Sequence, residues 1–531
     1  MKYNPESSAK EVYESLSTVR DNFLSRAERC SALTIPMLIP RNSASRRVGD
    51  IAEFPTPRQG VGARGVNHLS SRILLTLLPP QAPFFKYSIG PNELDQLSEL
   101  APEIQVEIKA SLSQREQSVQ QAVETENMRV PASEICKHLI VSGNALMRTP
   151  KSGGIQFFPL SQYVVMRDAE GDQITDLVVR ECLDEAALPM KVLAQYQAAV
   201  KKDKDAEDCD TDICIYTRMR LMKKNRYEIW QEFEDGTKIE KTSGSYNSDN
   251  VEFHALRWTK VPGESYGRGL VEEYLGDLVA LEGLSQALIE GALAAARLVG
   301  LVRPNGNTRP KDLNDAPNGS FVPGVDGDVK FLQIEKSQDF STAAEISSRI
   351  EKRLEGAFLL NSSVIRDAER VTAEEVRFAA QELETTLGGV YSVLASEFQL
   401  PLVRSITARL ESSGSIRRFP PQLKKVIKPV VVTGVDALGR NAELERFRAG
   451  FKILAETVGP ELAASVMKAG PLATFIFSQV GSTIKGIIKT PEELAQEQQQ
   501  AQMAQMAQEA VSKGIGPGIN ALAQQQQQPQ G

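Results

Sequence analysis

The sequence has few of the residues from which disulfide frameworks and metal centres are built. Its 531 residues include five cysteines and three histidines. An odd and scattered set of cysteines is typical of free thiols in a reducing compartment, so we expect no disulfide framework. Cys209 and Cys214 lie near each other but have no second Cys or His pair at ligand spacing, which argues against zinc. We therefore expect neither a metal nor a cofactor.

The sequence also lacks the segments that mark a nucleotide-driven motor, a secreted protein or a membrane protein. No G-x-x-x-x-G-K-[ST] segment occurs, so the chain has no P-loop for ATP phosphates. The N-terminus, MKYNPESSAKEVYESL, has no apolar region of the kind found in signal peptides. The uncharged run at residues 469–484 is short and broken by Gly, Pro and Ser. We expect a cytoplasmic protein that does not enter a membrane.

Charge of one sign does not dominate. The formal net charge is -7, from 61 basic and 68 acidic residues, so we expect no broadly positive surface for tight nucleic-acid binding. This charge does not exclude weak or transient contact with DNA. With 41% apolar and 24% charged residues, the composition is that of a soluble globular protein with room for two or three cores.

One stretch does match a catalytic motif. GESYG, residues 263–267, has the G-x-S-x-G spacing of a nucleophile elbow. The hydrolase order requires a histidine after Ser265, whereas all three histidines precede it. We therefore interpret Gly263 and Gly267 as parts of a turn that redirects the chain into a helix. A serine hydrolase is kept as a remote alternative, which labelling of Ser265 by a fluorophosphonate probe would support.

The spacing of apolar residues predicts a helical protein with one β-rich insert. Spacings of three and four predict helices around residues 12–23 and over residues 60–78. From about Ile155 to Trp258 the pattern changes to short strands, among them residues 163–167 and 174–180, which flank the turn DAEGD. The charge run KKDKDAED that interrupts the insert is interpreted as a solvated loop.

Two long helices are predicted after the insert. Residues 270–299 have one apolar face, and their second half is rich in small residues that permit close helix approach. A Pro/Gly/Asn-rich stretch follows. The next helix is predicted over about residues 343–360, with an apolar stripe at i, i+4 spacing formed by Ile346, Ile350, Leu354 and Phe358.

A charged loop without glycine or proline follows, NSSVIRDAERVTAEEV, residues 361–376. Thr372 and Glu375 form a T-x-x-E capping box that predicts the start of another helix. That helix is predicted to reach about Gln399 and to kink at the pair Gly388 and Gly389. The glutamine-rich end of the chain has the composition of a disordered segment.

Long blocks of the sequence resemble the portal proteins, or head-to-tail connectors, of short-tailed bacteriophages of the podovirus type. VPGESYGRGLVEEYLGDLVALEGL and VTAEEVRFAAQELETTLGGVYSVLASEFQLPLVR resemble the two most characteristic blocks of that family. VGARGVNHLSSRILLTLLPP, LIVSGNALM and TGVDALGR fall in the same order. The likeness reaches about residue 490 and fails in residues 185–250 and in the glutamine-rich tail. The implied fold class is α+β, mainly helical.

The resemblance implies that each chain is one subunit of a ring. The implied parts are a wing (1–265) with a β-rich insert, a stem helix (266–300), a clip (301–340), a second stem helix (341–360), a tunnel loop (361–371), a kinked long helix with the wing return (372–431), a helical crown (432–490) and a disordered tail (491–531).

The resemblance also implies a function. Such rings, with twelve subunits, form a channel at one capsid vertex through which double-stranded DNA is packaged and later ejected. The implied partners are further copies of the chain, double-stranded DNA, the terminase packaging motor, a tail adaptor, and the major capsid and scaffold proteins. The implied location is the virion, with assembly in the cytoplasm of the bacterial host, and no enzymatic activity is implied. The alternative is a structural ring or scaffold that passes no DNA.

Five residues are expected to face the channel. Arg366 and Arg370 of the tunnel loop would meet passing phosphates. On the second stem helix, a turn of 100° per residue puts Lys352 opposite the apolar stripe, with Ser348 and Glu355 beside it. A wall of mixed sign would let DNA slide rather than hold it. The alternative is that this helix face meets solvent and lines nothing.

Four basic residues of the clip are expected to contact the motor and later the tail adaptor, since exposed charges steer docking. They are Arg303, Arg309, Lys311 and Lys330.

Overall fold

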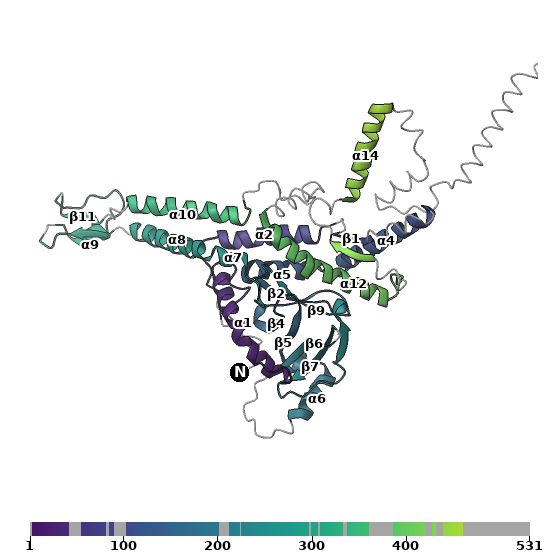
Figure 1. The fold of residues 1–531 in the computed structure, drawn as a ribbon. Helices are drawn as coiled ribbons and strands as arrows, with labels where there is room; N and C mark the ends of the chain where they lie inside the picture. Colours follow the sequence, from purple (N-terminus) through teal and green to yellow (C-terminus); the bar gives the residue numbers. More distant parts are fainter. Residues whose placement is uncertain are drawn as a thin grey trace, which may run out of the picture. The chain divides into compact units, whose positions relative to one another are not determined.

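The structure is a computed structural model of the whole chain (Figure 1). It describes residues 3–41, 55–80, 84–89, 102–200, 212–223, 225–296, 299–305, 308–325, 327–332, 337–360, 386–419, 427–431 and 439–459. Five predictions concern segments outside these residues: the charge run, the tunnel loop, the capping box, the C-terminal part of the crown and the glutamine-rich tail. The chain divides into two units, Met1–Asp95 with Arg115–Val435, and Gln96–Gln114 with Asp436–Gly531.

Helices form the base of the first unit, as the sequence predicts. Both expected N-terminal helices are confirmed, and the chain adds two more before the insert. In order they are α1 (Ala9–Ala32), α2 (Val61–Leu77), α4 (Pro102–Thr125) and α5 (Arg129–Ser142). Of α4, only the part from Arg115 onward belongs to the first unit. The side chain of Ser8 caps α1 by accepting a hydrogen bond from the backbone N–H of Glu11. Helices α2 and α5 pack against each other.

The β-rich insert is confirmed as two antiparallel sheets. One has the strand order β3-β2-β9, from β2 (Asn144–Arg148), β3 (Gln156–Phe158) and β9 (Phe253–Arg257). The other is a meander of β4 (Tyr163–Arg167), β5 (Ile174–Asp184), β6 (Asp212–Met222), β7 (Arg226–Phe233) and β8 (Gly244–Asn247). Helix α1 covers the meander, and Val12 and Leu16 pack there against Val164 and Val178. Helix α6 (Met190–Val200) was not predicted.

The expectation that the cysteines are free thiols was wrong for one pair. Strands β5 and β6 pair in a register that sets Cys182 directly opposite Cys214, and the two form a disulfide. Cys30 and Cys136 are free and buried, as expected. Register between strands depends on pairing along their whole length, which cysteine spacing does not reveal.

The predicted continuous stem helix is interrupted. Helix α7 (Leu270–Glu273) ends at Tyr274, whose backbone leaves the helical region (φ -105°, ψ 14°), and α8 (Leu275–Ala295) follows. The prediction to residue 299 was also wrong at its end, because strand β10 (Val299–Val302) begins there. Leu270 and Val271 are buried in the main core, which holds α7 against the helical base.

The second stem helix, α10 (Ser337–Ala357), begins about one turn and a half before the predicted start. It lies side by side with α8 (Figure 1). Leu278 and Leu281 of α8 share one core with Ile350 and Leu354 of α10. The chain between α8 and α10 forms β10, α9 (Pro310–Asn314) and β11 (Val329–Leu332). Strands β10 and β11 pair in an antiparallel ladder.

The return to the wing is helical and changes register once. Residues 386–394 are α-helical through Gly388 and Gly389, a π-helical turn, η5, covers Ala395–Gln399, and α12 (Leu400–Ser412) follows. A bend at the glycine pair stays a prediction. Strand β12 (Ile427–Val431) then pairs with β1 (Phe85–Ile89). In the second unit, α14 (Gly439–Val458) is a helix, in line with a helical crown.

Candidate functional site

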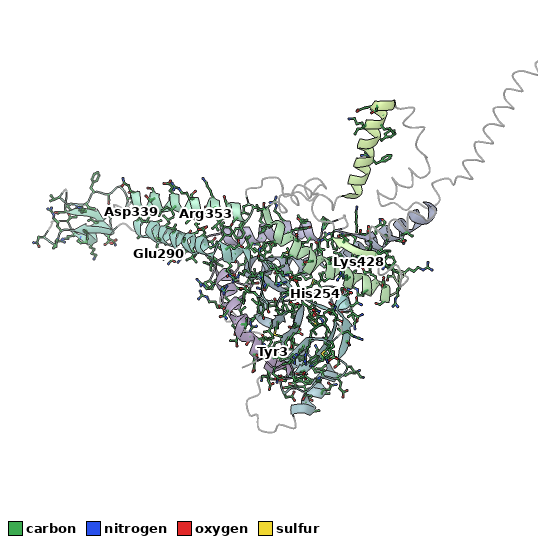
Figure 2. The ribbon with its side chains drawn as sticks, in the orientation of Figure 1. Tyr3, His254, Glu290, Asp339, Arg353 and Lys428 are labelled. Atoms are coloured by element: carbon green, nitrogen blue, oxygen red, sulfur yellow. A yellow bond between two sulfur atoms is a disulfide. The ribbon has the colours of Figure 1, made fainter. Side chains whose placement is uncertain are left out.

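Helix α10 carries charges of both signs on its exposed side, as the sequence predicts. Ser348 and Lys352 are exposed. Glu355 is half-buried and accepts a hydrogen bond from the Arg64 guanidinium of α2 at 2.6 Å. The Arg353 guanidinium contacts the Asp277 carboxylate of α8 at 2.7 Å. Figure 2 shows Arg353 and other charged side chains along this pair of helices.

The buried side of α10 determines which face points outward. Ile350, Leu354 and Phe358 are buried, whereas Ile346, the first residue of the predicted stripe, is 44% exposed. The ring of Phe358 fills the space where a side chain at Gly65 of α2 would lie. This packing turns Ser348 and Lys352 away from the core, so both are free to meet whatever lies beside the stem.

The outer face of α8 carries large apolar side chains that are uncovered in the single chain, and the exposed Gln286 and Glu290 lie beside them. Val279, Ile289 and Leu293 are 50%, 45% and 63% exposed. Among the described residues, α8 is the one helix that is both long enough and apolar enough to cross a membrane, judged by length and composition alone. Uncharged runs in the sequence did not indicate this apolar helix, because acidic residues interrupt α8. An exposed apolar face of this length is typical of a surface that contacts another protein or a membrane.

The four basic clip residues are all exposed. Arg303 directly follows β10 and Arg309 directly precedes α9. Lys311 lies on α9 and Lys330 on β11. In the described part of the clip no acidic side chain forms an ion pair with any of them. Their positive charges are therefore available to an acidic partner surface.

The GESYG turn is a structural junction. Gly263 has a φ of +79°, which a residue with a side chain rarely adopts. The hydroxyl of Ser265 accepts a hydrogen bond from the backbone N–H of Arg167 at 3.2 Å. Gly267 donates its N–H to the Asn144 side chain at 2.8 Å and accepts one from it at 2.8 Å. Sequence reasoning missed Asn144, because it lies 123 positions away.

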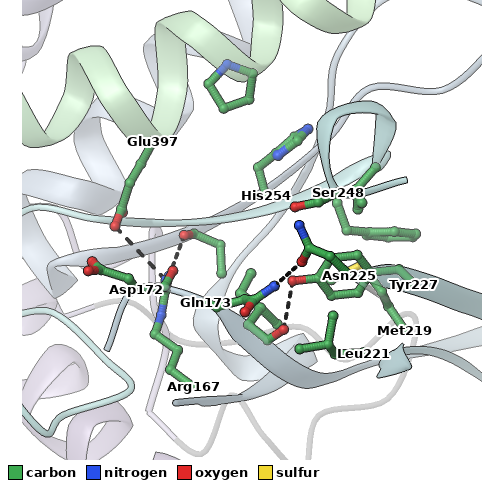
Figure 3. Close-up of a pocket in the computed structure, with 15 residues that line it drawn as sticks. Arg167, Asp172, Gln173, Met219, Leu221, Asn225, Tyr227, Ser248, His254 and Glu397 are labelled. Atoms are coloured by element: carbon green, nitrogen blue, oxygen red, sulfur yellow. Dashed lines mark hydrogen bonds and ion pairs between the residues drawn. The ribbon is translucent and has the colours of Figure 1, made fainter. Parts of the chain in front are cut away.

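A cavity of about 720 Å³ lies between the β-rich insert and the η5–α12 segment. Figure 3 shows Arg167 and Glu397 at one side of it and Asn225 and Tyr227 at the other. Burial lowers the pKa of His254, which also lines the cavity, to about 4, so its imidazole is neutral near pH 7. The sequence offered no signal for this cavity, whose lining comes from five separate stretches of chain.

The strongest charges beside this cavity are already paired. The Arg257 guanidinium donates to Glu397 at 3.0 Å, and the Arg167 guanidinium lies 4.0 Å from the same carboxylate. Lys260 pairs with Asp172. Among the residues that the structure describes, no group of three or more His, Cys, Asp and Glu could hold a metal ion. The ion pairs of Glu397 with Arg257 and Arg167 join the β-rich insert to the η5–α12 segment beside the cavity.

Comparison with known proteins identifies the family. The model of the family described as "Bacteriophage head to tail connecting protein" matches residues 6–487. The chain belongs to this family. The resemblance read from the sequence blocks is thereby confirmed, and the mixed helical and β architecture agrees with it.

The curated relatives are full-length matches. The portal protein of Enterobacteria phage T3 is 38% identical over 527 residues, which cover 98% of this chain and 95% of that protein. The portal protein of Escherichia phage T7 is 36% identical, with 98% and 94% covered. The portal protein of Enterobacteria phage SP6 is 30% identical, with 96% and 95% covered.

A solved structure of the neck of an empty GTA particle gives a TM-score of 0.35 at 12% identity, over 80% of this chain and 90% of that chain. A likeness this distant carries no argument about function.

Proposed function

We propose that this chain forms a ring-shaped channel at one capsid vertex, through which double-stranded DNA is packaged and later ejected. The ring docks the terminase packaging motor first and the tail adaptor afterwards, and it contacts the major capsid and scaffold proteins. The same proposal includes four further points: the ring has twelve subunits, it is part of the virion, it assembles in the bacterial cytoplasm, and it has no enzymatic activity.

The observation that carries the proposal is the uncovered apolar face of α8. Fully burying an exposed Val or Leu side chain contributes about 1.5–3 kcal/mol, and covering Val279 and Leu293, which are 50% and 63% exposed, would contribute roughly half of that for each. A neighbouring copy in a ring would cover this face on every subunit, because a rotational interface that closes leaves no subunit with an uncovered contact surface. The family to which the chain belongs supports this occupant.

A membrane is a poorer occupant for the same face. Helix α8 packs along α10, and Arg353 of α10 is held against Asp277 of α8 at 2.7 Å. Lys352 is exposed on the same helix. A bilayer that received α8 would have to receive its charged partner helix too, and each charged side chain at the bilayer centre costs several kcal/mol.

The charged side of α10 supports a channel wall. Ser348, Lys352 and Glu355 offer one hydroxyl, one positive and one negative group, and Glu355 is partly neutralised by Arg64. DNA bound by many lysines and arginines is held in a salt-sensitive way, whereas a wall of mixed sign permits sliding. Arg366 and Arg370 of the tunnel loop are proposed to narrow the passage.

Electron microscopy of the purified protein tests the ring, and paired substitutions test the interface. Val279→Glu with Leu293→Glu places two charges on the apolar face of α8. We expect rings with an axial opening for the parent and loss of rings for this variant. The matched control is Val130→Glu with Met190→Glu, which changes residues that are 70% and 87% exposed on α5 and α6 and should leave the rings intact.

Three outcomes count against parts of the proposal. A parent protein that stays monomeric at high concentration and at every salt concentration contradicts the ring. Rings without an opening wide enough for a duplex favour a structural ring or scaffold that passes no DNA. Labelling of Ser265 by a fluorophosphonate probe would favour the hydrolase. The structural role of Ser265, whose hydroxyl accepts a hydrogen bond from the Arg167 backbone, argues against that activity.

A further inference from the structure

Cys182 and Cys214 lie near the end of the β5–β6 ladder. The strand register pairs them directly, and Asp184 with Asp212, two positions further on, is the last pair of the ladder. The two cysteines are 32 positions apart in the chain, and helix α6 lies between them. Their disulfide therefore closes the loop that carries α6, next to the point where the two strands separate.

Helix α6 is held by a small apolar core of its own. The side chains that α6 supplies to it are only partly buried: Val192, Leu193 and Tyr196. They pack against a cluster that includes Ile213 of β6 and Phe233 of β7. Figure 1 shows α6 at the tip of the insert, beside β7. Because so small a core buries little apolar surface, a covalent link that closes the loop adds stability to this part of the fold.

The disulfide is accessible to small molecules, unlike the other described cysteines. Cys182 and Cys214 are half-buried, and Cys214 lies at the edge of the core between α1 and the meander. Cys30 and Cys136 are buried, and burial raises the pKa of each thiol to about 12. The thiolate is the reactive form of cysteine, so these two thiols are inert near pH 7. Of the described cysteines, only the Cys182–Cys214 pair is placed to respond to a change of redox conditions.

The proposed function takes the chain through two redox environments. Cytoplasmic thiols are kept reduced, whereas disulfides form and persist outside cells. We infer that Cys182 and Cys214 are a site of reversible oxidation by a small-molecule disulfide: two thiols while the ring assembles, and a disulfide that fastens α6 once the virion has left the cell. The inference rests on the proposed function, which supplies the two environments.

The oxidation consists of two exchange steps. The thiolate of one cysteine attacks a sulfur atom of the external disulfide and displaces one small thiolate. The thiolate of the other cysteine then attacks the protein sulfur of the mixed disulfide, which forms the Cys182–Cys214 bond and displaces the second small thiolate. The pair gives up two protons and two electrons, and one external disulfide becomes two thiols.

Alkylation under denaturing conditions, followed by peptide mass spectrometry, tests the state of the pair. Cys209→Ser serves as the background, because Cys209 lies outside the described residues and close to Cys214 in the chain. When expressing cells are quenched in acid, we expect Cys182 and Cys214 to be alkylated. After the purified protein has been incubated with glutathione disulfide, we expect neither to be alkylated. Cys30 and Cys136 are the internal controls and should be alkylated in both samples.

Hydrogen exchange measures what the disulfide does to α6. The backbone amides of α6 should exchange about ten-fold more slowly in the oxidised than in the reduced parent, because the link removes open conformations of the loop. Helix α5 is the internal control and should exchange equally in both states. Cys182→Ser with Cys214→Ser should exchange like the reduced parent in either buffer.

The outcomes separate the inference from the proposed function. A pair that is already oxidised in quenched cells overturns the inference and leaves the ring standing, and so does a pair that stays reduced in glutathione disulfide. Equal exchange of α6 in the two states of the parent also overturns it, because the link then fastens nothing. A parent that shows both redox states but forms no rings contradicts the proposed function and supports the site.

Discussion

Asn144 and Gly267 are 123 positions apart in the chain and exchange two buried hydrogen bonds of 2.8 Å. A Cβ atom at Gly267 would lie 2.7 Å from the carbonyl oxygen of Gly143, so the strand and the turn meet there without room for a side chain. The glycine of the G-x-S-x-G match is thus explained by close backbone approach, and the serine between the glycines holds the backbone of β4.

Asn144→Ala should lower the free energy of unfolding by about 2 kcal/mol. The reason is that it leaves the N–H and the carbonyl of Gly267 buried without partners. Urea unfolding of unassembled protein measures this. Gln286→Ala removes an exposed side-chain hydrogen bond on α8 and should cost less than about 0.5 kcal/mol. Equal effects of the two substitutions would show that the junction is not held by Asn144.

Among the elements, the pair α8 and α10 depends on one close approach near its end. A side chain at Gly291 of α8 would collide with the ring of Phe340 of α10. Gly283, on the same helix, has no atom within 4 Å of the place of a Cβ. The two glycines look alike in the sequence, yet only Gly291 is needed for packing within the chain.

Gly291→Ala should therefore destabilise the unassembled protein by about 1–3 kcal/mol through overpacking, although alanine favours a helix. Gly283→Ala, the matched control, should stabilise it by up to about 1 kcal/mol. Adding Phe340→Ala to Gly291→Ala should recover part of the loss, since it removes the collision, and the double-mutant cycle measures this coupling. Additive effects of the two substitutions would contradict a direct contact.

For the whole molecule, the tunnel loop is the part on which DNA passage is proposed to depend. Arg366→Ala with Arg370→Ala removes two positive charges and should change the free energy of unfolding by less than about 0.5 kcal/mol. Rings should still assemble, while the retention or passage of packaged DNA should change. Thr372→Ala removes the predicted helix cap and should cost about 1 kcal/mol with little effect on DNA.

Two results would contradict the role of this loop. A double arginine variant that packages, retains and ejects DNA as the parent does would show that the loop makes no contact that matters to DNA. A double arginine variant that forms no rings would show that the two arginines hold subunits together. Electron microscopy of rings, together with packaging assays, distinguishes these results.

The sequence by itself determined the elements whose signal is local. Helix α2 and the strands β4 and β5 around their turn were predicted because apolar periodicity and turn residues act within a few positions. The exposed charges of α10 followed from the same periodicity. Family membership was also readable from the sequence, because long blocks of residues carry it.

Only the tertiary structure decided the features that depend on distant residues. The break at Tyr274, the disulfide between Cys182 and Cys214, and the contact of Glu355 with Arg64 each require the packing of separate elements. The uncovered face of α8 belongs here too, because periodicity predicts an apolar stripe but not which part of it another helix covers. The physical reason is that hydrophobic burial and strand register are decided by the partner surface, which the local sequence does not contain.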